Sequence, residues 1–188
     1  MLCDPLSDFD YSPVLAEASM EQPLILCYVV KKDLSVIVGF YKKEVPPDRN
    51  EQAMLLSFNE MFLSFAKSTK SQAFMVWLGG SPLFEVEIHN AKLHFPYEEA
   101  YTPGEKEYYM ILKAGGFDQA EPAVYVKGLQ LCLNYFQNFP EVERILALVN
   151  AGPYAQQQAD LFLQAGMTKT LEIDHPEQAQ LYQISRSL

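Results

Sequence analysis

The chain has 188 residues, a formal net charge of −10 and an apolar fraction of 49%, a composition typical of one globular domain. Only 14 Lys and Arg residues stand against 24 Asp and Glu residues, which argues against binding to nucleic acid or to an anionic membrane surface. The same charge would attract a cationic substrate such as an amine. Residues 1–20 contain no Lys or Arg and no apolar run is long enough to span a membrane, so we expect no signal peptide and a cytoplasmic protein.

The three cysteines, Cys3, Cys27 and Cys132, are odd in number and far apart in the sequence. This spacing matches neither a metal-binding motif nor a disulfide framework. Cys27 and Cys132 lie in apolar runs, so we expect both to be buried as small hydrophobic residues. The sequence therefore predicts no metal site.

The first third of the chain begins with a polar, turn-rich segment over residues 1–22, which we interpret as a loosely ordered lead-in with a short helix around 13–19. Residues 24–30 and 34–41 are β-rich runs joined by a short polar turn, which predicts a hairpin. Residues 51–67 carry apolar side chains at helical spacing, which predicts a helix.

The middle of the chain predicts a strand over 72–78 that ends at a Gly-Gly-Ser-Pro turn, followed by a second strand over 83–90. In that second strand Glu85, Glu87 and His89 alternate with apolar residues and share one face. Two readings of this row remain open. The row supplies a general base with its partner, or it is the solvated face of an antiparallel strand.

The segment 106–139 reads as a buried strand, a turn with two glycines and an amphipathic helix, after a loop over 91–105. Residues 144–150 predict a strand and 154–165 a helix capped by Gly166. The chain ends with strands expected over 167–173 and 179–185. This order of elements predicts one domain with a mixed α/β sheet.

Four segments resemble the GCN5-related N-acetyltransferase (GNAT) superfamily. Residues 107–113 look like its central strand, 123–136 like the helix after its acyl-CoA pyrophosphate loop, 140–145 like the junction into its next strand, and 159–167 like its later helix, which ends in Ala-Gly and an apolar residue. The resemblance covers residues 72–186 and implies a mostly antiparallel sheet flanked by helices. Within the superfamily, 82–89, 97–101 and 108–112 look nearest to the siderophore-type amine acyltransferases.

The resemblance also implies a cosubstrate, acetyl-CoA or another acyl-CoA, and a set of site residues. The backbone of the central strand and the glycine turn would bind acyl-CoA, together with an Asn near the later helix, which gives Ile111, Leu112, Lys113, Gly115, Gly116 and Asn150. Glu87 or His89 would accept the amine proton, and Tyr154 would protonate the leaving thiolate.

The turn departs from the family pattern. It reads Ala-Gly-Gly-Phe-Asp-Gln-Ala-Glu-Pro, lacks arginine and places Asp118 and Glu121 where a negatively charged ligand would lie. Two functions therefore stay open: an N-acyltransferase that acts on a small amine, and a degenerate GNAT-like binding or structural module. A homodimer is compatible with either function.

Overall fold

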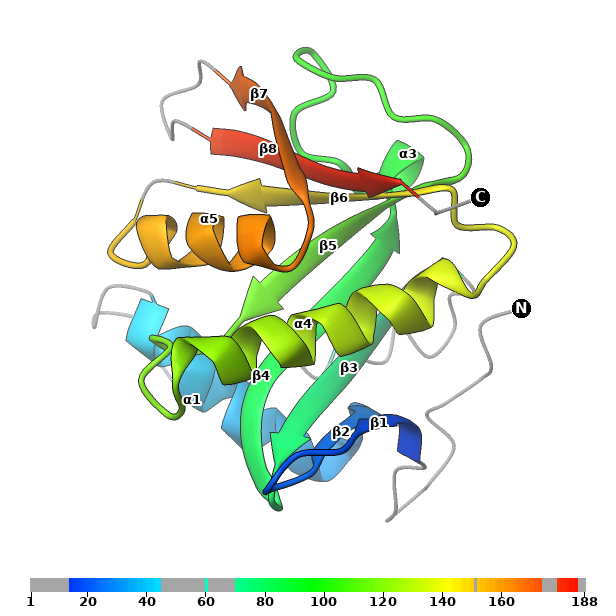
Figure 1. The fold of residues 1–188 in the computed structure, drawn as a ribbon. Coiled ribbons are helices and arrows are strands. Elements are labelled where there is room, and N and C mark those ends of the chain that lie inside the picture. Colours follow the sequence, from blue (N-terminus) through cyan, green and yellow to red (C-terminus); the bar gives the residue numbers. More distant parts are fainter. Residues whose placement is uncertain (1–13, 45–59, 61–69, 151, 174–178, 186–188) are drawn as a thin grey trace. The chain divides into compact units, whose positions relative to one another are not determined.

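The computed structural model describes residues 14–44, 60, 70–150, 152–173 and 179–185 (Figure 1). Within these ranges eight strands form one sheet in the order β1-β2-β3-β4-β5-β6-β8-β7. The strands are β1 Val14–Ala18, β2 Leu24–Tyr28, β3 Ser71–Leu78, β4 Ser81–Asn90, β5 Glu107–Lys113, β6 Arg144–Val149, β7 Thr168–Ile173 and β8 Ala179–Ser185. The helices are η1 Lys31–Asp33, α1 Leu34–Glu44, α3 Ala91–His94, α4 Pro122–Gln137 and α5 Ala155–Gln164.

The predicted mixed α/β class is confirmed by this order and by the strand directions. The pairs β1–β2, β2–β3, β6–β8 and β7–β8 are antiparallel, whereas β5 and β6 are parallel. The chain divides into two compact units. The first comprises Met1–Glu87 and Leu112–Gln119, and the second comprises Ile88–Ile111 and Ala120–Leu188.

The core of the first unit forms where α1 packs on β3 and on Val29, and it corrects one prediction. The expected strand over 34–41 is wrong, because Leu34, Ile37 and Val38 lie on one helical face and are buried with Ala73 and Met75. The backbone N–H of Val30 donates to the Asp33 carboxylate at 3.0 Å, in the turn just before the helix. Burial of an i, i+3, i+4 stripe outweighs the strand preference of β-branched residues here.

The start of the described chain is a strand rather than the predicted helix around 13–19. β1 pairs antiparallel with β2 from Val14↔Cys27 to Ala18↔Leu24. A helix of so few residues is unstable unless it is packed, whereas pairing along β2 satisfies the backbone groups. The predicted helix over 51–67 lies outside the described residues except for Glu60.

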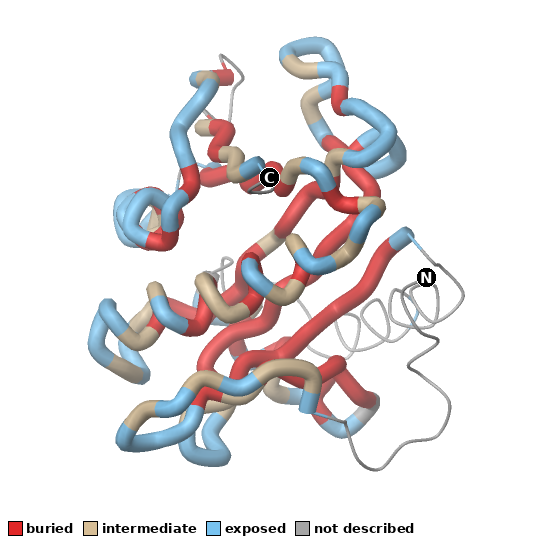
Figure 2. The backbone as a smooth tube through the Cα atoms, turned by 45° about the vertical axis from the view of Figure 1, so that its right-hand side comes forward, coloured by how far each residue is buried: buried red, intermediate tan, exposed pale blue. Residues whose placement is uncertain are grey.

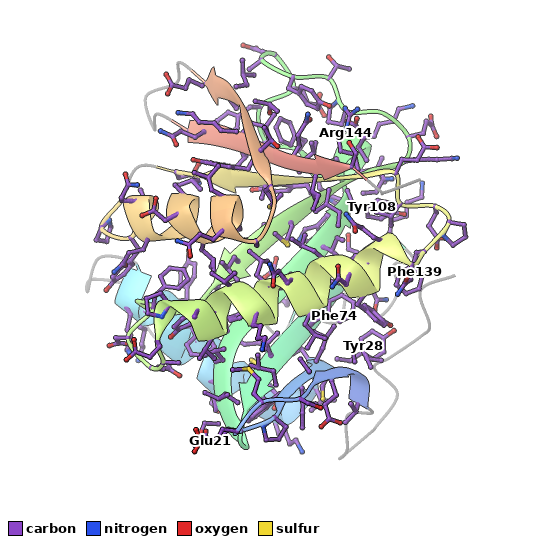
Figure 3. All side chains as sticks on the ribbon, in the orientation of Figure 1. Glu21, Tyr28, Phe74, Tyr108, Phe139 and Arg144 are labelled. Atoms are coloured by element: carbon purple, nitrogen blue, oxygen red, sulfur yellow. The ribbon has the colours of Figure 1, made fainter. Side chains whose placement is uncertain are left out.

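The turn between β3 and β4 is the one that the sequence predicts. Gly79 and Gly80 have φ values of 54° and 89°, so the two strands are joined by a two-residue turn of the left-handed kind that hairpins favour. Tyr28 of β2 stacks on Phe74 of β3 with ring centroids 5.2 Å apart, on the face of these strands shown in Figure 3.

The second unit contains the helices α4 and α5 and the strands β6, β8 and β7. One face of α4 is buried through Tyr125, Gly128, Leu129, Cys132, Leu133 and Phe136. A separate cluster on these strands joins Leu146, Leu148, Leu181 and Ile173 to Phe95. The predicted strands at the end of the chain are confirmed, and β6, β8 and β7 lie side by side in Figure 1.

The C-terminal cap of α5 is confirmed at Gly166, whose φ is 98°. The backbone N–H of Gly166 donates to Leu163 at 3.1 Å and that of Met167 donates to Phe162 at 2.9 Å, which is the hydrogen-bond pattern of a Schellman motif.

Two further sequence predictions concern single residues and the membrane. Cys27 and Cys132 are buried as predicted, and neither forms a disulfide within the described part of the chain. None of the helices in that part is both long and apolar enough to cross a bilayer.

Candidate functional site

The row of polar residues on β4 is buried. Every residue from Leu83 to Asn90 is buried (Figure 2), and the relative exposures of Glu85, Glu87 and His89 are 0%, 2% and 6%. Residues that point to opposite faces of β4 are buried alike, so both faces of this strand are covered. The reading of this row as a solvated face is therefore wrong.

Lys113, the last residue of β5, lies between the two glutamates. Its ammonium donates a hydrogen bond to Oε1 of Glu87 and lies 3.6 Å from Oε2 of Glu85. The side chain of Lys113 is 10% exposed. Neither carboxylate oxygen of Glu85 has a hydrogen-bond partner among the described residues. The sequence separates Lys113 from Glu87 by 26 positions, so the pairing of β4 with β5 is what joins them.

The three groups carry a net charge of −1 if both glutamates are ionised. Burial raises the pKa of Glu85 well above its ordinary value, the Lys113 ammonium opposes this shift, and the negative charge of Glu87 adds to it. The pKa of Lys113 is pulled down by burial, but the two carboxylates together outweigh burial and raise it. The raised pKa means that Glu85 keeps its proton to a higher pH than an ordinary glutamate does.

His89, two residues after Glu87 on β4, faces a second histidine. The ring centroids of His89 and His94 are 5.3 Å apart, and those of His89 and Tyr109 are 6.5 Å apart. β4 ends at Asn90, and α3 returns the chain so that His94 lies near His89. Burial and the charge of His89 lower the pKa of His94. Within the described ranges no cluster of three His, Cys, Asp or Glu side chains is suited to a metal ion.

The glycine turn after β5 has an unusual backbone. Three consecutive residues, Gly115, Gly116 and Phe117, have φ values of 63°, 117° and 54°. A Cβ atom built on Gly115 would lie 2.9 Å from Cα of Phe40 on α1, so only glycine fits between this turn and the helix. Phe117 adopts a conformation that is rare for a bulky residue, and such outliers are concentrated at functional sites.

A lysine of α1 offsets one acid of the turn. Nζ of Lys43 lies 3.4 Å from Oδ1 of Asp118, and the two side chains are 48% and 66% exposed. An ion pair this exposed stabilises the fold little, but it places a cation at the turn. Sequence reasoning missed Lys43, because it assigned the preceding residues to a strand. Lys113, which precedes the turn, pairs instead with Glu85 and Glu87.

The parallel strands β5 and β6 stop pairing before either ends. Their pairing runs from Glu107↔Arg144 to Met110↔Ala147, while β5 extends to Lys113 and β6 to Val149 within the described chain. β6 remains paired with β8 as far as Val149↔Gln180. Ile111, which is half-buried, is the first residue of β5 beyond the last pair.

The other two predicted site residues lie in the second unit near α5. Tyr154 is half-buried at the N-cap position of α5, where its carbonyl accepts a hydrogen bond from the N–H of Gln158 at 3.0 Å. Asn150 is exposed just after β6, and its Oδ1 accepts a hydrogen bond from the Tyr97 hydroxyl at 3.5 Å. The loop after α3 therefore contacts the residue that the resemblance assigns to acyl-CoA.

That loop is anchored at its far end by the start of β5 and β6. Arg144, labelled in Figure 3, donates to Oε1 of Glu107 at 2.7 Å, and the Tyr101 hydroxyl donates to Oε2 of Glu107 at 2.7 Å. The backbone N–H of Gly104 donates to the same Oε2 at 3.1 Å. These contacts fix the loop to the beginning of β5 and β6, where the two strands are paired.

No protein-family model matches the chain, and no curated protein does. Solved structures match it closely in fold. The aminoglycoside acetyltransferase AAC(6′)-Ib in complex with coenzyme A has a TM-score of 0.69 at 13% identity over 87% of this chain and 95% of its own. The ribosomal L7/L12 α-N-protein acetyltransferase RimL in complex with coenzyme A has a TM-score of 0.67 at 7% identity over 92% and 98%.

An uncharacterized protein from Bacillus halodurans also matches, with a TM-score of 0.67 at 14% identity over 92% of each chain. Identities this low show the fold alone. The chain thus has the fold of the GNAT acetyltransferases, as its sequence predicts.

Proposed function

We propose that the protein is an acyl-CoA-dependent N-acyltransferase that transfers an acyl group to a small amine. The observation that carries the proposal is the separation of β5 from β6 beyond Met110↔Ala147, directly before the glycine turn. A strand that has left its neighbour can form main-chain hydrogen bonds with an extended ligand. The pantetheine arm of CoA, which contains amide groups, is such a ligand, so Ile111, Leu112 and Lys113 are proposed to bind it.

The glycine turn supports a phosphate subsite next to that strand. Gly115 and Gly116 are buried, and the turn leads into α4, which starts at Pro122, the first-turn position where a missing N–H is tolerated. Backbone N–H groups at a helix start favour anions, and Lys43 brings positive charge to the turn. These features favour CoA binding in spite of Asp118 and the missing arginine.

For the chemistry, the amine nitrogen attacks the thioester carbonyl, the C–S bond breaks, and CoA leaves as a thiolate. We propose that His89 accepts the amine proton and that Tyr154 protonates the thiolate. His89 is favoured over Glu87 because Oε1 of Glu87 already accepts a hydrogen bond from Lys113. Asn150, which contacts Tyr97, is proposed to contact the bound acyl-CoA.

The acceptor is proposed to be a small cationic amine, of the type used in siderophore assembly. The net charge of −10 favours a cation. The neighbours in fold differ in their acceptors, since one is named for aminoglycosides and another for a protein α-amino group. The fold alone therefore does not select the amine.

A second function is favoured by one observation. Asp118 and Glu121 are exposed acids at the turn where phosphates would bind, and the described turn contains no arginine. A protein of this fold that has lost acyl transfer and acts as a binding or structural module would retain the core and tolerate such acids.

A ligand titration tests the proposal. Acetyl-CoA at a hundredfold excess over its dissociation constant should stabilise the protein by about 2.7 kcal/mol in thermal unfolding. Absence of a shift with millimolar acetyl-CoA and succinyl-CoA would exclude the enzyme. If CoA binds, turnover with a panel of small amines separates the two functions, because the module binds without turning over.

The matched variants are His89→Ala and His94→Ala. Removing a general base slows turnover by about 10²- to 10⁴-fold. We expect this loss for His89→Ala and a change of no more than a few fold for His94→Ala, which removes a neighbouring, exposed ring. Equal effects of the two variants would rule out His89 as the base.

A further inference from the structure

The cluster of Glu85, Glu87 and Lys113 needs an explanation other than stability. All three side chains are at most 10% exposed, and taking such ions out of water costs several kcal/mol for each ion. Apolar residues of similar size commonly give equal or greater stability at such positions. The cluster therefore serves something that apolar packing alone would not provide.

Its place in the chain indicates what that is. Lys113 ends β5, and the next residues form the turn in which Gly115 packs against Phe40 of α1. Both glutamates belong to β4, the neighbouring strand in the sheet. The ammonium group is thus fixed from β4 at the residue from which the glycine turn departs.

The direction of the lysine side chain is also determined by the cluster. The ammonium group has one favoured position, because it donates a hydrogen bond to one carboxylate and lies 3.6 Å from a second. Apolar packing contacts are not directional, so an apolar side chain of the same length would be placed by its fit alone. A fixed side-chain position at Lys113 restricts the backbone at the start of the turn. The turn contains three residues with positive φ, Gly115, Gly116 and Phe117.

We propose that Lys113, held by Glu85 and Glu87, is a positioning residue that fixes the glycine turn of residues 114–119 in the conformation that binds the phosphates of acyl-CoA. The proposal rests on the proposed function for its ligand. It assigns Glu85, which the sequence did not single out from its row, a smaller role in CoA affinity than Glu87. It also gives Lys113 a role through its side chain rather than its backbone alone.

The test is the double variant Glu87→Gln/Lys113→Met, which keeps the side-chain volumes and removes one positive and one negative charge. Two measurements are made: amide hydrogen exchange of residues 114–119, and the dissociation constant for CoA. We expect exchange in the turn to be about tenfold faster and CoA binding about tenfold weaker, equivalent to about 1.4 kcal/mol. Protection within α4 should not change.

Two companion variants separate positioning from general loosening. Glu85→Gln retains the hydrogen bond from Lys113 to Glu87, so its exchange and affinity should lie nearer to those of the natural protein. Lys113→Arg retains the positive charge and should recover most of the affinity that the double variant loses. If the double variant does not fold, Glu87→Gln is compared with Glu85→Gln, and a larger effect of Glu87→Gln on exchange in the turn supports the proposal.

Three results would overturn the proposal: exchange in the turn within twofold of the natural protein, CoA affinity unchanged despite faster exchange, or equal effects of Glu85→Gln and Glu87→Gln. Failure of the proposed function has a different signature. In that case the natural protein does not bind CoA at all, while the exchange measurement still reports whether Lys113 holds the turn.

Discussion

Replacing Glu85 by Gln should change how stability depends on pH. Neither carboxylate oxygen of Glu85 has a hydrogen-bond partner among the described residues, and the Lys113 ammonium lies 3.6 Å away. At an effective dielectric constant of about 20 that separation gives an attraction of about 5 kcal/mol. Desolvation of a fully buried carboxylate and repulsion by Glu87 oppose it, and the pKa of Glu85 is raised well above its ordinary value.

The sign follows from proton counting. Above the unfolded glutamate pKa of about 4.3, the unfolded chain has lost the Glu85 proton while the folded chain keeps it. The folded state then binds more protons, so its stability falls as pH rises, by up to about 1.4 kcal/mol per pH unit, until the folded pKa is reached. Glu85→Gln removes this loss. The free energy of unfolding of the variant, relative to that of the natural protein, should therefore increase as pH rises from the unfolded to the folded pKa of Glu85.

Urea unfolding between pH 5 and pH 8 measures the difference. Glu98→Gln, which removes the same formal charge from an exposed loop position, controls for the change in net charge. Groups that titrate elsewhere cancel in the comparison, because Glu85 faces only Glu87 and Lys113 among the interactions that determine its pKa. A difference that is flat with pH, or that favours the natural protein as pH rises, would refute the raised pKa of Glu85.

Two further predictions concern the glycine turn. Gly115→Ala should destabilise the fold by about 2 to 4 kcal/mol, because it adds overpacking against Cα of Phe40 at 2.9 Å to the strain of a positive φ. Gly80→Ala, also at positive φ but with open space around it, should lose only about 1 kcal/mol, and equal losses in urea unfolding would contradict the packing argument. In CoA titrations Lys43→Met should weaken binding and Asp118→Asn should strengthen it, each by about two- to fivefold at low salt. Effects of the same sign, or effects that high salt does not reduce, would show that the ion pair does not tune the turn.

Sequence reasoning succeeded where local rules and burial agree. The order of strand, turn and helix within residues 106–139 is predicted correctly, because an apolar run, two glycines and a first-turn proline favour it. The bounds 107–113 and 123–136 came from the resemblance and agree with β5 and α4 to within a residue. Glycines predict the hairpin turn after Leu78 and the cap at Gly166, because both features need residues with positive φ. Such features need no knowledge of the rest of the fold.

It failed where long-range packing decides. The residues that form α1 have β-branched side chains at their centre, and only their burial against β3 and Val29 makes them helical. Because of that error, the sequence did not predict that Lys43 lies beside the glycine turn. The Glu85 and Glu87 row was expected to be either catalytic or solvated. Alternation cannot tell a strand that is covered on both faces from one with a wet face, nor can it identify a lysine 26 residues away.

The parallel pairing of β5 with β6 has a consequence for the order of folding. Its first pair, Glu107↔Arg144, joins residues 37 positions apart, with all of α4 between them, whereas β7 and β8 meet at Ile173↔Ala179. Contacts that close a longer loop form later on average, since more chain entropy is lost before they are made. The pairing of β5 with β6, beside which the proposed ligand would lie, is therefore expected to form late in folding and to break early in unfolding. A ligand bound there should slow unfolding more than it speeds folding.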